Sequence, residues 1–206
     1  YGLALAGVLA AAAPSAMANA QLEIISGSSS TTITANALGV ATFTGTVGAW
    51  ALTLTSGVTY PTAGTPATPT LDIGSVVGAG SAPLEILFSD DGYTQQGVAD
   101  YVVHLNGAVN ISSVVSTLYA TAGSHLLDTT GTQIFSTSTA NGTASGLISV
   151  GSPYSLTEEV LITPGRGAGS FLSFDGTVTV PDGGIALTSL GSAFVLLAGV
   201  SRKFRK

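Results

Sequence analysis

The chain has 206 residues and a formal net charge of −6, and only 8% of its residues are charged, against about 25% in ordinary soluble domains. It contains no cysteine, which excludes disulfides, thiolate metal sites and cysteine nucleophiles. Four of the five basic residues follow residue 200, so the rest carries one basic and eleven acidic residues, a net charge near −10 that excludes the clustered basic surface nucleic-acid binding requires.

The N-terminal segment is apolar over residues 1–13 and then passes through Pro14 into small residues. Small side chains at alternate positions fit a signal-peptidase pocket, so residues 1–20 are predicted to be a helical signal peptide cleaved after Ala18 or Ala20. The apolar run is shorter than the roughly 20 residues that a transmembrane helix needs, which favours a signal peptide over a membrane anchor. Because no initiator Met or basic residue precedes the run, we expect the sequence to be truncated at its start.

Residues 21–179 are predicted to form one all-β domain, a β-sandwich of jelly-roll or immunoglobulin-like topology, because apolar residues recur there with a period of two. Residues 60–70 contain three prolines and are predicted to be a long surface loop. The apolar faces expected to be buried are Ala41, Phe43 and Val47; Trp50, Leu52 and Leu54; Leu84, Ile86 and Phe88; Tyr101, Val103 and Leu105; and Leu172, Phe174, Val178 and Val180. The expected turns are Asn36, Ser56-Gly57, Asp91-Gly92, Asn106-Gly107, Asn141-Gly142 and residues 165–169.

The sequence of this domain suggests two kinds of ligand site. The turn-like Asp90-Asp91-Gly92 could supply oxygen ligands to calcium, joined by Asp72 or Asp100 if the fold brings them together. Calcium is the only cofactor that the sequence suggests. Exposed aromatic residues could instead form a platform on which sugars stack. The candidates for that platform are Trp50, Tyr60, Tyr93 and Tyr154.

No catalytic residue is predicted. His104 is expected to be an exposed strand residue, and His125 a loop residue that Asp128 could orient, but no Gly-x-Ser-x-Gly elbow supplies a nucleophile. Glu158 and Glu159 are adjacent on a predicted strand, so their side chains should point to opposite faces and cannot converge on one sugar.

Residues 180–206 have three parts: the motif Val180-Pro181-Asp182-Gly183-Gly184, an apolar stretch over residues 185–200, and a basic cluster. Because basic residues are retained on the cytoplasmic side, the apolar stretch is predicted to be a helix that holds the motif at the outer membrane face. Its sixteen residues are short for a stable span and suit a temporary anchor. The basic cluster contains Arg202, Lys203, Arg205 and Lys206.

This tail resembles the VPDSG-CTERM variant of the PEP-CTERM sorting domains, which exosortases process in Gram-negative bacteria that make exopolysaccharide. Val180, Pro181, Asp182 and Gly184 match the variant, whereas Gly183 stands where the variant has serine. The match covers about an eighth of the chain. The resemblance implies cleavage near the motif by an exosortase, and transfer to the cell surface or release into an extracellular polysaccharide matrix.

The leading hypothesis is therefore a non-enzymatic exported surface or matrix protein with a structural or adhesive role. Signal peptidase and an exosortase would be its processing partners, and polysaccharide its surroundings. The alternatives are a carbohydrate- or calcium-binding module and a secreted hydrolase.

Overall fold

The computed structural model of the protein describes residues 19–138, 141–166 and 170–181. Within them the chain forms twelve β-strands and no helix, so the predicted all-β fold is confirmed and this part offers no helix to cross a membrane. The predicted signal helix and C-terminal hydrophobic helix lie outside the described residues. The strands are β1 (Gln21–Ser26), β2 (Ser29–Thr34), β3 (Val40–Val47), β4 (Trp50–Val58), β5 (Thr70–Gly80), β6 (Leu84–Tyr93), β7 (Gly97–Val109), β8 (Ile111–Ala122), β9 (Thr132–Thr137), β10 (Asn141–Ile148), β11 (Tyr154–Pro164) and β12 (Ser170–Thr179).

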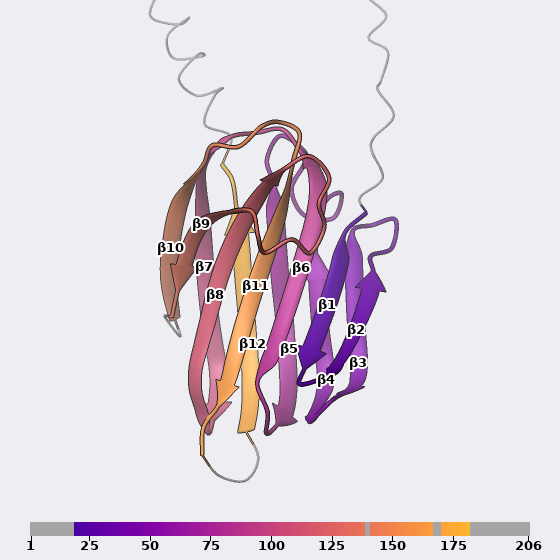
Figure 1. Ribbon diagram of the computed structural model, residues 1–206, viewed down its shortest axis with the longest axis vertical. Helices are drawn as coiled ribbons and strands as arrows, with labels where there is room; N and C mark the ends of the chain where they lie inside the picture. The colour runs from indigo at the N-terminus through magenta and orange to yellow at the C-terminus, as the bar shows by residue number, and fades with distance from the viewer. Residues whose placement is uncertain (1–18, 139–140, 167–169, 182–206) are drawn as a thin grey trace, which may run out of the picture.

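The strands form two antiparallel sheets that pack face to face as a β-sandwich (Figure 1). Sheet A has the order β2-β1-β6-β11-β8-β9, and sheet B has the order β10-β7-β12-β5-β4-β3. The last eight strands pair as nested partners: β5 with β12, β6 with β11, β7 with β10 and β8 with β9. These pairs alternate between the sheets, which is the connectivity of a jelly roll, and β1 to β4 widen both sheets on one side.

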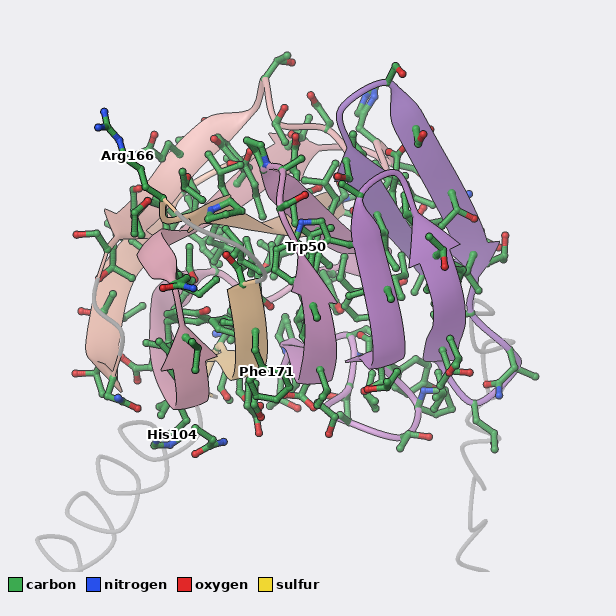
Figure 2. All side chains as sticks on the ribbon, turned by 90° about the horizontal axis from the view of Figure 1, so that it is seen from below. Trp50, His104, Arg166 and Phe171 are labelled. Atoms are coloured by element: carbon green, nitrogen blue, oxygen red, sulfur yellow. The ribbon has the colours of Figure 1, made fainter. Side chains whose placement is uncertain are left out.

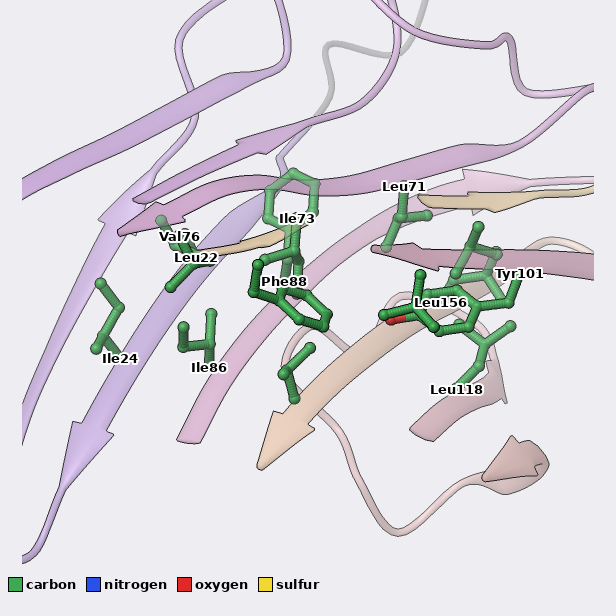
Figure 3. Packing of buried hydrophobic residues seen from close by; sticks show 14 of the residues in the cluster. Leu22, Ile24, Leu71, Ile73, Val76, Ile86, Phe88, Tyr101, Leu118 and Leu156 are labelled. Carbon is green, nitrogen blue, oxygen red and sulfur yellow. The ribbon is translucent and has the colours of Figure 1, made fainter. Parts of the chain in front are cut away.

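The core lies between the sheets, where side chains at alternate strand positions meet (Figure 3). Phe88 and Ile86 of sheet A face Ile73 of sheet B, and all three are fully buried. The predicted apolar faces are confirmed for every side chain whose burial is described, a set that does not include Leu54. Phe43 and Leu105 are partly rather than fully buried. Each fully buried side chain of this size contributes roughly 1.5–3 kcal/mol.

Several predicted turns are strand interior instead. Ser56-Gly57 lies within β4, Asn106-Gly107 within β7 and Asn141-Gly142 at the start of β10. At Gly57 a Cβ would lie 2.4 Å from the ring of Phe88. This strand position therefore needs glycine because a larger residue would collide with a core aromatic. The turn after β7 is instead at Asn110, whose φ of 55° is left-handed, a conformation that asparagine tolerates.

The chain enters and leaves the described fold at the same end of the sandwich (Figure 1). Ala20 and Val180 are both fully buried there. The carbonyl of Ala20 accepts a hydrogen bond from the Ala35 N–H at 2.8 Å, and the Val180 N–H donates to the carbonyl of Pro69 at 2.9 Å. Pro69 belongs to the connection between β4 and β5, which confirms the predicted loop except at its last residue, Thr70, where β5 begins.

Candidate functional site

A buried cluster of polar side chains lies at this same end of the sandwich. Asp90, near the end of β6, meets Thr59, which directly follows β4, and Tyr93. The Thr59 hydroxyl oxygen is 2.9 Å from Asp90 Oδ2, 2.7 Å from the Tyr93 hydroxyl and 2.9 Å from the Thr70 carbonyl. The Tyr93 hydroxyl also reaches Asp90 Oδ2 at 3.2 Å. The cluster therefore joins β6 to both ends of the loop that holds Val180.

Asp90 is buried because it is one of the alternate residues of β6 whose side chains point into the core. Leu84, Ile86 and Phe88 point into the core, and Asp90 is the next residue in that series, with only 1% of its surface exposed. The prediction of a turn at Asp90-Asp91-Gly92 is wrong, because these residues belong to β6. The signal that could have revealed this burial was the alternation itself.

The structure does not bring the four proposed calcium ligands together. Asp91 pairs with the Ser124 hydroxyl, whereas Asp72 and Asp100 belong to sheet B. Asp72 accepts a hydrogen bond from Thr177 at 2.7 Å, and Asp100 lies opposite Thr179. Within the described residues, no group of three or more acidic or histidine side chains could hold a metal ion.

Burial raises the pKa of Asp90 to about 6, against hydrogen bonds from the Asp91 N–H, Thr59 and Tyr93 that lower it. The geometry gives the same direction. The two hydroxyl groups carry two protons between them, yet four oxygen pairs are within hydrogen-bond distance, and the Thr70 carbonyl can only accept. A proton on Asp90 supplies a third donor, so the cluster favours the neutral acid.

We expect Asp90→Asn to flatten the pH dependence of the free energy of unfolding. The folded pKa of about 6 lies above the unfolded value of 3.8, so the folded protein keeps a proton that the unfolded chain releases. Stability is then full below about pH 4 and falls as the pH rises through 6, by about 3 kcal/mol. Urea unfolding at pH 4.5 and pH 7 measures this change.

The matched variant Asp90→Ala removes the carboxyl group that Thr59, Tyr93 and the Asp91 N–H contact, and it should be less stable at both pH values, by roughly 1–3 kcal/mol. If Asp90→Asn keeps the pH slope of the parent protein, the titrating group lies elsewhere.

The two histidines lie where the sequence placed them. His104 is exposed on the outer face of sheet B and points away from the core (Figure 2). His125 is exposed in the loop between β8 and β9. Asp175 of β12 lies directly opposite His104 in the register, a neighbour that only strand pairing reveals. Asp128 bonds instead to Thr121 and Thr130, and hydrogen bonds from Thr130 lower its pKa. Within the described part, neither histidine ring hydrogen-bonds to a hydroxyl group.

Glu158 and Glu159 point to opposite faces of β11, as predicted. Glu159 accepts a hydrogen bond from the Tyr119 hydroxyl at 3.1 Å on the outer face of sheet A. Glu158 is fully buried in the core, and its position in the series Leu156, Glu158, Val160 is the signal that could have predicted this.

The aromatic residues proposed as a sugar platform are not exposed as a group. Trp50, Tyr93 and Tyr154 have at most 1% of their surface accessible, and Tyr60 is only partly exposed. Among the described aromatic residues, Phe171 of β12 falls in the exposed class, with 43% of its surface accessible, and it lies on the same face as His104 (Figure 2). Its ring lies beside Gly107, where a Cβ would be 3.6 Å from Cε1.

The arrangement determines what this polar cluster can do. Thr59, Asp90 and Tyr93 are each at most 1% exposed, so a soluble substrate cannot reach them. The cluster instead stabilises the loops at the end where the chain enters and leaves.

A surface depression of about 400 Å³ between β7 and β10 contains a single carboxylate, Asp100. No protein-family model and no curated protein sequence matches the chain.

Proposed function

We propose that this chain is an exported bacterial surface or extracellular-matrix protein with a structural or adhesive role, not an enzyme. In this proposal the sandwich is the mature domain and the flanking segments are processing signals. The observation that carries it is the common exit of both ends: the chain enters and leaves the sandwich at one end (Figure 1), where Ala20 and Val180 are buried and each makes a backbone hydrogen bond to a loop. Removal of the segments beyond them would leave all twelve described strands intact.

The burial of Ala20 favours one of the two predicted signal-peptidase sites. Cleavage after Ala20 would remove a fully buried residue and the acceptor of the Ala35 N–H. Cleavage after Ala18, which lies outside the described residues, would keep that contact. We therefore assign the start of the mature protein to Asn19, which is exposed.

The burial of Val180 limits where an exosortase could act. Val180 is held by its hydrogen bond to Pro69, whereas Pro181 is exposed. Asp182, Gly183 and Gly184 lie outside the described residues. A protease that needs an extended, accessible substrate would therefore cut after Val180, within residues 181–184. The basic cluster would leave with the tail, so the mature domain would keep one basic residue, Arg166.

Mass spectrometry of the protein from its native host tests this proposal. We expect an N-terminus at Asn19 and a C-terminus within residues 181–184. The control variant Pro181→Ala should retain the tail if the motif directs the cut. A mature protein that still ends in Arg205-Lys206 would refute processing, and a start at Gln21 would refute the assignment to Asn19.

A further inference from the structure

The edge strands of the two sheets carry no charged side chain or proline that would oppose pairing with other strands. The edge strands are β2 and β9 in sheet A and β3 and β10 in sheet B. All four lie in the described part of the chain, and none contains a charged residue or a proline. Natural sheets commonly place lysine, proline, bulges or covering segments at their edges, because an open edge presents unpaired N–H and C=O groups.

Three of these edges are protected in another way. The register of β3 is broken by an irregularity between Phe43 and Gly45, and that of β9 by a shift between Leu118 and Tyr119 of its partner. The backbone of β10 is covered at Gly146, where a Cβ would lie 2.1 Å from the Ile134 carbonyl of β9. Such irregularities and covers disfavour a further strand.

β2 has no bulge. It pairs with β1 in unbroken register from Gln21↔Thr34 to Ser26↔Ser29. Alternate residues of an antiparallel edge strand turn their N–H and C=O groups away from the neighbour, so β2 offers a regular row of donors and acceptors. Ser30, Thr32 and Thr34 are exposed along it, and hydroxyl side chains of this kind form favourable pairs across strands.

We infer that β2 pairs antiparallel with β2 of a second copy of this chain, which joins the two A sheets into one continuous sheet. Pairing of a strand with its own copy about a two-fold axis is self-complementary, so one surface suffices for both partners. Backbone hydrogen bonds of this type are the means by which proteins add a strand to an open sheet edge.

The distribution of charge favours a second copy at this edge. The described residues carry ten acidic side chains and one basic side chain, so two copies repel at most surfaces. Contact through the outer face of sheet A would bring together two copies of Glu23, Glu85 and Glu159, and within one copy burial and the charges of Glu159 and Glu23 already raise the pKa of Glu85. Pairing through β2 keeps the nearest acids, the two Glu23 residues on β1, about 14 Å apart at roughly 4.8 Å per strand, beyond the screening length of about 8 Å.

This pairing deepens the proposed structural role without depending on the cleavage of either end. The absence of cysteine from the chain makes a position-specific test possible. The full chain is produced in the host with Thr32→Cys on β2, and with the matched control Thr143→Cys on β10, also exposed on an edge strand. Both cysteines are first shown to react with a monofunctional maleimide, and a short bismaleimide then traps neighbouring copies.

We expect a covalent dimer with Thr32→Cys in severalfold excess over the Thr143→Cys control. Adding Ser30→Lys and Thr34→Lys to the Thr32→Cys chain should reduce the dimer to the control level, because lysines would face one another across the new strand pair. Equal yields at the two positions, absence of a Thr32→Cys dimer, or cross-linking to another protein would each overturn the inference. Loss of the signal peptide or tail is scored separately by mass and does not affect this readout.

Discussion

Glu158→Gln is expected to stabilise the protein at neutral pH and to remove much of its dependence on pH. Glu158 lies in the middle of sheet A with its side chain in the core, where no part of it is exposed. Neither carboxyl oxygen has a hydrogen-bond partner within the described part of the chain, and the same is true of the Tyr101 hydroxyl. Both groups lie beside Gly176, where a Cβ would be 2.4 Å from the Tyr101 hydroxyl and 2.9 Å from Glu158 Oε1.

Burial raises the pKa of Glu158 well above its ordinary value of 4.5, and the charge of Asp72 raises it further. The unfolded chain releases the proton above about pH 4.5, while the folded protein keeps it. Stability is therefore greatest at low pH and falls as the pH rises from 4.5 toward the folded pKa, by about 1.4 kcal/mol for each pH unit over which the proton is retained. Glutamine has nearly the same shape and cannot ionise, so the variant avoids this loss.

We expect Glu158→Gln to be more stable than the parent protein at pH 7 by roughly 1–3 kcal/mol, and nearly equal to it at pH 4.5. Urea unfolding followed by circular dichroism across this range measures both values. Glu159→Gln changes the neighbouring carboxyl on the outer face of the same strand and controls for the loss of net charge. If Glu158→Gln and the parent protein show the same pH slope, the carboxyl of Glu158 does not hold a proton in the core.

Alternation along a strand could be predicted from the sequence because it is a local property. The series Leu84, Ile86 and Phe88 repeats every second residue, and no distant residue is needed to identify its buried face. The same series predicts the burial of Asp90, and Leu156 with Val160 predicts that of Glu158. The turn predicted at Asp90 is wrong because the acid-acid-glycine residue types favour a turn while the alternation favours a strand, whereas the opposite orientation of Glu158 and Glu159 follows from the alternation and is confirmed.

The role of glycine could not be predicted in this way. Gly57 and Gly80 resemble turn residues, yet each lies in a strand against an aromatic ring, Phe88 and Trp50 respectively. For Gly57 that ring comes from the opposite sheet, so its need for space depends on how the sheets pack. The pairing of His104 with Asp175, and the regular edge at β2, likewise follow from strand order, which local patterns leave open.

Trp50 and Gly80 are expected to show a large and non-additive effect on stability. Trp50 is fully buried, and its Nε1–H donates to the Ala82 carbonyl at 2.6 Å. It lies opposite Gly80 across β4 and β5, and a Cβ at Gly80 would be only 2.3 Å from ring atom Cδ2. Trp50→Ala should cost about 3–5 kcal/mol, because it removes a large core side chain and leaves a cavity.

Gly80→Ala should cost roughly 1–3 kcal/mol in the parent protein, because the new methyl group displaces the indole ring. In the Trp50→Ala background the same change should cost nothing or add about 0.4–1 kcal/mol of stability, since the ring is absent and alanine restricts the unfolded chain. A double-mutant cycle by urea unfolding, followed by circular dichroism, measures the coupling. Additive costs would mean that the ring does not pack on Gly80, and a change within about 0.5 kcal/mol for Trp50→Ala would restore the exposed indole required by a sugar-stacking platform.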